Sequence, residues 1–191
     1  MFMGVLLRRL AQQDAAKAKE LASQDFFKTD PNYRGAVAVA KAVVSSAPYD
    51  ELLSIYSRAA DDEDRVNVLS GLLMIKDRKG FEKALDFMKS EHVKKQDLRY
   101  ISYAALNYYN YDSFWLWFKD NLNVLRKVFS KSGVLPRLIT SVVPFIGIDR
   151  EDEVKEFFGR IEMPEAVLGI RNGLELLEVY SRLRRSIIAS L

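Results

Sequence analysis

Cysteine is absent from the 191 residues of the chain, and histidine occurs once, as His92. Without cysteine the chain has no disulfide bond, no thiolate metal site and no cysteine nucleophile, a composition that fits a reducing compartment such as the cytoplasm. One histidine cannot form the His-Glu-x-x-His zinc site. Because His92 lies in the polar segment Ser90–Lys94, we predict a surface loop residue that binds no metal.

Other common catalytic and cofactor motifs are also missing. The sequence has no Gly-x-Ser-x-Gly nucleophile elbow and no glycine-rich phosphate-binding loop. The acidic run Asp61–Asp64 lacks the glycine turn and the spaced ligands of a calcium loop, so we interpret it as a solvated helix start. We therefore assign no catalytic, cofactor-binding or metal-binding residue to this chain.

Long apolar runs are absent as well, and no stretch reaches the length that is needed to cross a bilayer. The apolar start of the chain is too short for an export signal, and Arg8 and Arg9 follow it instead of preceding it. We expect residues 1–13 to form a cut-off or capping helix, and we predict no membrane partner.

Charge is nearly balanced, with a formal net charge of +3. Such a mild excess permits an acidic partner without requiring one. The basic cluster Arg182–Arg185 is too small for a nucleic-acid footprint, and cations near a helix C-terminus interact favourably with the helix dipole. We therefore do not predict a nucleic-acid partner.

Hydrophobic residues make up 49% of the chain, which is enough to build a core. The strongest pattern lies between Tyr111 and Phe129, where large apolar side chains recur at steps of three and four. This spacing places them along one side of a long helix, and we predict that this helix lies in the core. The recurring residues are Phe114, Trp117, Phe118, Leu122, Leu125 and Phe129.

Helical patterns with short breaks continue along the rest of the chain, and no strand-like alternation of useful length occurs. Asp14 is expected to cap a helix that runs to about Phe27, and Asp30-Pro31 and Asp149 mark further helix starts. Another helix is expected from Gln96-Asp97. Its inward residues are predicted to be Leu98, Ile101, Ala105 and Tyr108.

Matching apolar positions repeat along the chain at a period of roughly 31 to 33 residues, within the range of stacked helical repeats. A single helix pair cannot bury its own apolar face, so neighbouring pairs must stack. We predict an all-α fold in which residues 1–191 form one domain, a HEAT-like α-solenoid of antiparallel helix pairs with a right-handed superhelix. The matching sets are Val37, Val68 and Ile101; Tyr49, Phe81 and Phe114; and Leu53, Leu85 and Phe118.

Short motifs follow one another in a characteristic order. They are Asp30-Pro-Asn-Tyr-Arg34; Val93, Gln96 and Asp97; Trp115, Trp117 and Asn121; Glu153, Val154, Phe157 and Phe158; and Ile170, Leu174 and Glu175. In order and spacing, residues 14–183 resemble the C-terminal helical domain of the M1 zinc aminopeptidases, including the archaeal tricorn-interacting aminopeptidases. The family often has tryptophan after the Asn121 position and in the final helix, where this chain has Leu122 and Tyr180.

The resemblance implies a non-catalytic domain, because the family's Gly-x-Met-Glu-Asn and zinc motifs lie in an earlier domain. It implies that the helical domain walls a peptide-sized chamber, contributes to its opening and closing and helps to select peptide length. The implied partners are peptide substrates and a catalytic domain, in the same protein or a separate subunit. Zinc is expected in that catalytic domain and no cofactor in this chain.

We do not assign the residues that would face such a chamber. Tyrosine and arginine side chains on a concave face can hold a peptide carboxylate. The candidates are Tyr103, Tyr108, Tyr109, Arg137 and Arg171, and none of them is assigned. The alternative function is an independent HEAT-like scaffold that binds a protein partner; an enzyme or a nucleic-acid binder on a helical-repeat fold is a third.

Overall fold

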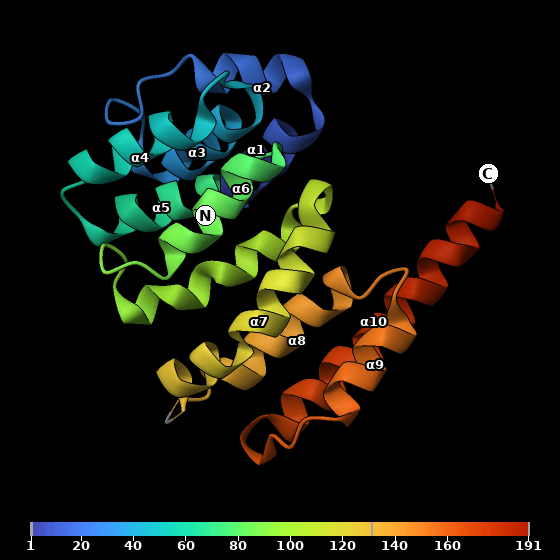
Figure 1. Ribbon diagram of the computed structural model, residues 1–191. Coiled ribbons are helices and arrows are strands. Elements are labelled where there is room, and N and C mark those ends of the chain that lie inside the picture. Colours follow the sequence, from blue (N-terminus) through green and yellow to red (C-terminus); the bar gives the residue numbers. More distant parts are fainter. Residues whose placement is uncertain (1, 131, 191) are drawn as a thin grey trace. The chain divides into compact units, whose positions relative to one another are not determined.

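The computed structural model describes residues 2–130 and 132–190, and side chains from Gly4 onward. The described residues form helices and connecting turns without a strand, so the predicted all-α fold class is confirmed (Figure 1). The chain divides into two compact units, Met1–Asn110 and Tyr111–Leu191. Each unit has its own set of packed helices.

The first unit is organised around α3. A run of small and β-branched residues from Gly35 to Ala40 is entirely buried in this helix, because α1, α2, α4 and α5 surround it. A helix that is apolar on all sides is typical of a core position. The helices of the unit are α1 (Phe2–Gln13), α2 (Ala15–Ala22), α3 (Pro31–Val44), α4 (Pro48–Arg58), α5 (Asp62–Leu72), α6 (Arg78–Met88) and the 3-10 segments η1 (Lys95–Leu106) and η2 (Tyr108–Asn110).

Alternate helices of the first unit pack against one another. α5 lies between α3 and η1, and α4 contacts α6. Val37, Val68 and Ile101, the matching positions of α3, α5 and η1, are all fully buried. These three positions of the predicted period are therefore core positions of the first unit.

Aspartate side chains begin several helices. The Asp14 carboxylate accepts hydrogen bonds from the backbone N–H groups of Ala16 and Lys17 at 2.9 Å, and Asp30 accepts one from Asn32 at 2.8 Å. Both predicted caps are thus confirmed. The predicted end of the second helix is wrong, because α2 stops at Ala22 and the Asp25 carboxylate then folds the chain into a turn by accepting from the N–H of Phe27.

The element that starts near Gln96 is a 3-10 helix, and Tyr108 is exposed instead of inward. Two buried amides explain the exposure of Tyr108. The Asn107 side chain donates to the carbonyl oxygens of Leu73 and Ile75, and the Asn110 side chain donates to those of Ile75 and Lys76, at 2.8 to 3.1 Å. These bonds fix the backbone after Leu106 and turn the intervening tyrosines outward.

The second unit contains α7 (Tyr111–Phe129), α8 (Val134–Ile146), α9 (Glu151–Gly159), η3 (Pro164–Ala166) and α10 (Val167–Ala189). The six predicted stripe residues of α7 are all buried, which confirms the core helix. Asp149 does not cap α9. It has a φ of 66°, and Arg150 lies between it and the first helical residue, so the Asp149 carboxylate pairs with Arg184 instead.

α8 and α10 form the most extensive helix pair of the second unit. Gly169 allows their close approach, because a Cβ atom at this position would lie 2.4 Å from the carbonyl oxygen of Pro136. Gly173 repeats the arrangement one turn later, where a Cβ atom would lie 3.2 Å from Cβ of Val143. Across the described part of the chain, no helix combines the length and apolar character that a membrane span requires.

Candidate functional site

The Asp30–Arg34 motif folds the connection before α3 onto the core. The Arg34 guanidinium lies 2.7 and 2.9 Å from the two carboxylate oxygens of Asp64 and also donates to the carbonyl oxygens of Thr29 and Phe27, each at 3.1 Å. Asp64 is 4% exposed. The interpretation of Asp61–Asp64 as a solvated helix start is therefore wrong for Asp64, which is a buried anchor. Asp61 caps α5 by accepting from the N–H of Asp64.

The aromatic motif of α7 and the acidic-aromatic motif of α9 contact each other. Trp115 Nε1 donates to Glu153 Oε1 at 2.6 Å, and Lys119 Nζ lies 2.8 Å from the same oxygen. These two hydrogen bonds, from Lys119 first and then Trp115, lower the pKa of the Glu153 carboxyl below its ordinary value. The ring of Phe157 meets Trp115 edge-on at 5.1 Å, which completes the contact. Both motifs thus hold helices together.

Residues that could support metal or acid-base chemistry are dispersed. Within residues 2–130 and 132–190, no group of three histidine or carboxylate side chains is arranged to hold a metal ion. His92 is exposed, as predicted, and its ring stacks on Phe87 with centroids 6.2 Å apart.

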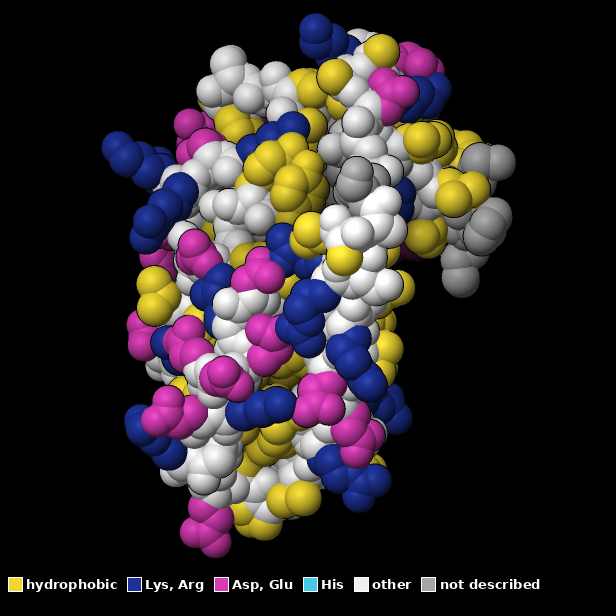
Figure 2. Space-filling model, turned by 90° about the vertical axis from the view of Figure 1, so that its right-hand side faces the viewer, with side chains coloured by type: hydrophobic (Ala, Val, Ile, Leu, Met, Phe, Trp, Pro, Cys, Tyr) yellow, Lys and Arg dark blue, Asp and Glu magenta, His cyan; other side chains and the backbone are white. Residues whose placement is uncertain are grey.

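The basic cluster near the end of α10 is engaged by carboxylates. Arg184 pairs with Asp149, and Arg185 lies 2.9 Å from Glu151. Acidic and basic side chains alternate over the face shown in Figure 2, with hydrophobic side chains between them. This mixed surface differs from the continuous basic stripe of a nucleic-acid-binding domain.

The tyrosine candidates lie in the first unit. Tyr103 stacks on Tyr100 with ring centroids 5.8 Å apart. Tyr108 and Tyr109 are exposed, and their hydroxyl groups are 2.5 Å apart. The hydrogen bond to Tyr109 raises the pKa of Tyr108 to about 12, whereas the bond that Tyr109 accepts, with Lys76 nearby, lowers the pKa of Tyr109.

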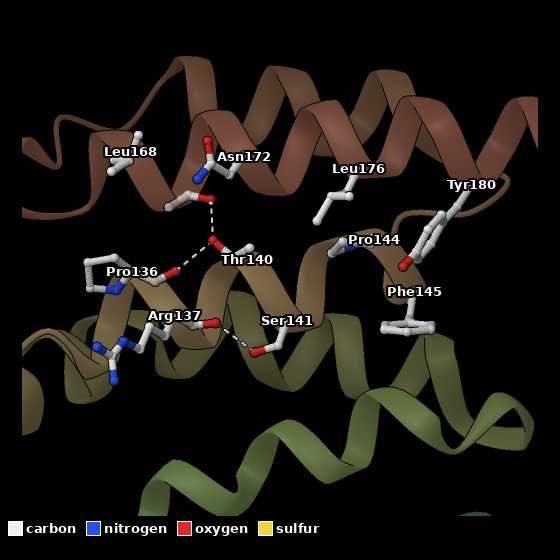
Figure 3. A pocket seen from close by; sticks show the side chains of 11 residues that line it. Pro136, Arg137, Thr140, Ser141, Pro144, Phe145, Leu168, Asn172, Leu176 and Tyr180 are labelled. Atoms are coloured by element: carbon white, nitrogen blue, oxygen red, sulfur yellow. Dashed lines mark hydrogen bonds between the residues drawn. The ribbon is translucent and has the colours of Figure 1, made fainter.

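The arginine candidates lie in the second unit, and their surroundings differ. Arg171 is exposed and pairs with Glu175 at 3.2 Å, one helical turn away. Arg137 lines a groove of about 520 Å³ between α8 and α10, which we call the α8–α10 groove (Figure 3). The groove lies between helices whose spacing the glycines set. Side chains that line it include Pro136, Arg137, Phe145, Leu168, Leu176 and Tyr180.

Sequence reasoning named Arg137 and Tyr180 but did not place them in a common groove. Figure 3 shows Pro136, Arg137 and Leu168 at one end of it and Phe145 and Tyr180 at the other. The rings of Phe145 and Tyr180 are 5.7 Å apart and close that end. A signal was available, because Leu168, Leu176 and Tyr180 recur at multiples of four along the last helix.

Comparison with known proteins gives a consistent family match. The family model described as ERAP1-like C-terminal domain matches residues 5–178. A leucyl aminopeptidase of Saccharolobus solfataricus is 36% identical over 157 residues, which are 81% of this chain and 20% of that protein. Probable aminopeptidase 2 of Sulfurisphaera tokodaii is 32% identical over 170 residues, 88% of this chain and 22% of its own length.

A third relative carries a more specific name. The Tricorn protease-interacting factor F2 of Thermoplasma volcanium is 29% identical over 183 residues, which are 94% of this chain and 23% of that protein. The chain therefore spans between a fifth and a quarter of the length of these relatives.

Proposed function

Because the chain belongs to the ERAP1-like C-terminal domain family, we propose that it is the non-catalytic C-terminal domain of an M1-type zinc aminopeptidase. The single observation that supports this most strongly is the family match over residues 5–178, together with relatives that are named aminopeptidases. In this proposal the peptidase site and its zinc belong to a catalytic domain outside this chain. That domain is part of the same protein or a separate subunit, in the cytoplasm.

The domain contributes to the reaction by forming a wall of the peptide chamber. Long helical surfaces suit this role, because they offer side chains to a peptide over several turns. The division of the chain into two compact units supports a wall that moves, since rigid units can rotate as bodies when a chamber opens and closes. A chamber of limited size then selects peptides by length.

The contacts of the family-like motifs support the proposal that these residues stabilise the folded domain. Arg34, Trp115 and Glu153 are all used in hydrogen bonds between elements of the same unit. None of these contacts requires a substrate. The motif residues therefore preserve the shape of the wall, and exposed residues of the same helices are left to contact peptides.

Two measurements test the proposal. The purified chain is expected to bind no stoichiometric zinc and to hydrolyse no aminoacyl-arylamide. Adding it to the catalytic part of the same enzyme is expected to change the preference for peptide length and to leave aminoacyl-arylamide hydrolysis unchanged, because that small substrate does not reach the wall. Unchanged length preference, or one tightly bound zinc per chain, would contradict the proposal.

The second candidate is an independent HEAT-like scaffold for a protein partner. The exposed apolar residues of α10, such as Leu168 and Leu183, favour it, because exposed apolar surface marks protein contacts. The neighbouring coding sequence separates the candidates. A reading frame that continues upstream into His-Glu-x-x-His supports the aminopeptidase domain. A frame without this motif leaves the scaffold and a domain that is encoded apart from its catalytic subunit, and the peptide-length assay separates these two.

A further inference from the structure

The α8–α10 groove has the properties of a binding site for a folded segment. We infer that it binds an amphipathic α-helix of a partner, with the apolar face of that helix on α10 and a carboxylate of its first turn beside Arg137. This inference is independent of the proposed function, because it depends only on contacts within the second unit.

The groove is already formed in the structure, and close backbone packing sets its width. Gly169 and Gly173 bring α10 close to α8, and the buried Leu177 of α10 packs beside Gly147 at the end of α8. The Thr140 hydroxyl lies 3.0 Å from the carbonyl oxygen of Pro136 and 3.1 Å from that of Gly169, so it ties the two helices together (Figure 3). A preformed groove reduces the entropy that is lost on binding.

The apolar surface of the groove extends along α10 beyond α8. Leu168 is 64% exposed, Leu183 58% and Ile187 51%. These residues recur with Leu176 and Tyr180 at helical spacing, so they form one stripe. From Leu168 to Tyr180 the stripe spans roughly 18 Å at about 1.5 Å per residue, which matches a partner helix of at least three turns.

Hydrogen bonding favours a helix over an extended peptide as the occupant. The Thr140 hydroxyl shares its one hydrogen between the carbonyl oxygens of Pro136 and Gly169, and the Ser141 hydroxyl donates to the carbonyl oxygen of Arg137 at 2.6 Å, so neither hydroxyl is a free donor for a bound backbone. An extended segment brings backbone N–H and C=O groups that need partners when they are buried. A helix satisfies these groups internally and needs mainly apolar contact.

Charge specifies the acidic end of the occupant. Of the described side chains that line the groove, Arg137 is the one that carries a charge, and the described carboxylates make no ion pair with it. A carboxylate placed there gains a charged hydrogen bond, and carboxylates are favoured in the first turn of a helix by its dipole. The N-terminus of the partner helix therefore lies at the Pro136 end.

Fluorescence anisotropy with the 191-residue chain and designed peptides tests the inference. The probe is a labelled peptide of about four turns with leucines at helical spacing and glutamates in its first turn. One control peptide carries a central proline, and another has lysines in place of the glutamates. The protein variants are Leu176→Glu and Arg137→Glu, with Leu116→Glu on the exposed side of α7 as the matched control.

Saturable binding of the helical probe with a Kd below about 1 mM is expected. The proline peptide and the Leu176→Glu variant should each weaken binding by at least about tenfold, whereas Leu116→Glu should leave it unchanged. Arg137→Glu should lower the affinity for the glutamate peptide about fivefold and should raise the affinity for the lysine peptide. Circular dichroism of each variant checks that the fold is retained.

Three results would overturn the inference. Absence of saturable binding would exclude an amphipathic helix as the occupant. Equal affinity of the proline peptide would assign the groove to an extended segment. Light scattering that shows a dimer, lost in Leu176→Glu and kept in Leu116→Glu, would assign the groove to a second copy of this chain.

Discussion

Arg34 and Asp64 form a buried ion pair with a nitrogen–oxygen distance of 2.7 Å, and it joins the first turn of α3 to that of α5. Arg34 also donates to two carbonyl oxygens of the preceding connection, so one side chain secures three segments. Its partner Asp64 is 4% exposed. The pair therefore has the satisfied hydrogen bonds that a buried charge needs.

Arg34→Met should lower the free energy of unfolding by about 3 kcal/mol, because it leaves the Asp64 carboxylate buried without its partner. The double variant Arg34→Met, Asp64→Leu should recover a large part of this loss. Denaturant melts measure both effects. Arg160→Ala, which removes an exposed pair with Glu156, is the matched control and should cost less than about 0.5 kcal/mol.

Trp115 and Trp117 should both be sensitive to truncation. Trp115 is 1% exposed and Trp117 is 9% exposed, so each alanine variant should lose about 3–5 kcal/mol of stability. Trp115→Phe keeps an aromatic ring and removes the hydrogen bond to Glu153, and it should cost about 1–2 kcal/mol. Denaturant melts that gave less than about 1 kcal/mol for Trp117→Ala would show that this side chain contributes little to the core.

Glu153 should make stability depend on pH in the acid range. Its hydrogen bonds to Lys119 and Trp115 hold the folded pKa below the ordinary value of 4.5, so the carboxylate form stabilises the fold. The stabilisation is complete above the ordinary value and is lost as pH falls through the folded pKa. The stability difference between wild type and Glu153→Gln should therefore shrink on acidification. A difference that grows toward low pH would mean that the protonated form of Glu153, and not the carboxylate, stabilises the fold.

Gly169→Ala should destabilise the second unit by about 1–3 kcal/mol, because the new methyl group meets the Pro136 backbone and the helices must separate. Gly159→Ala is the matched control. A Cβ atom there meets no described atom within 4 Å, and alanine in the last turn of α9 should add about 0.5 kcal/mol. Thermal melts of the two variants should therefore shift in opposite directions.

The tyrosine pair should titrate in two separate steps. Ultraviolet absorbance should show Tyr109 ionising below its ordinary value of 10.0 and Tyr108 at about 12. Tyr108→Phe removes the hydroxyl that stabilises the Tyr109 tyrosinate, so the pKa of Tyr109 should rise toward 10.0. Unchanged titration of Tyr109 in this variant would mean that the two hydroxyl groups do not interact in solution.

Local chemistry made much of the fold predictable. The stripe of α7 and the caps at Asp14 and Asp30 depend on residues close in sequence, so periodicity and capping rules were sufficient. Asp64 was misjudged because Arg34 lies in another helix, and only tertiary packing shows that the carboxylate is buried. The exposure of Tyr108 likewise depends on Asn107, which donates to carbonyl groups of a turn that is distant in sequence.

The motif contacts and the α8–α10 groove were less predictable than the fold. Family-like motifs such as Trp115 and Glu153 were visible in the sequence, but their mutual hydrogen bond appears only when α7 and α9 meet. The apolar residues of α10 follow a helical period, which indicates that they share one side of the helix but does not distinguish those that pack on a neighbour from those that line an open groove. A leucine that packs in the core and a leucine that lines an open groove have the same residue type and the same helical spacing, so the sequence does not distinguish them.

The shape of the α8–α10 groove and its selectivity depend on different residues, because the glycine contacts determine the shape and the lining side chains determine what can bind. Since the Pro136 and Gly169 backbones set the distance between the helices, substitutions at Leu168, Leu176 or Arg137 change the surface without moving its frame. Such a frame can acquire a new partner through one or two exposed substitutions.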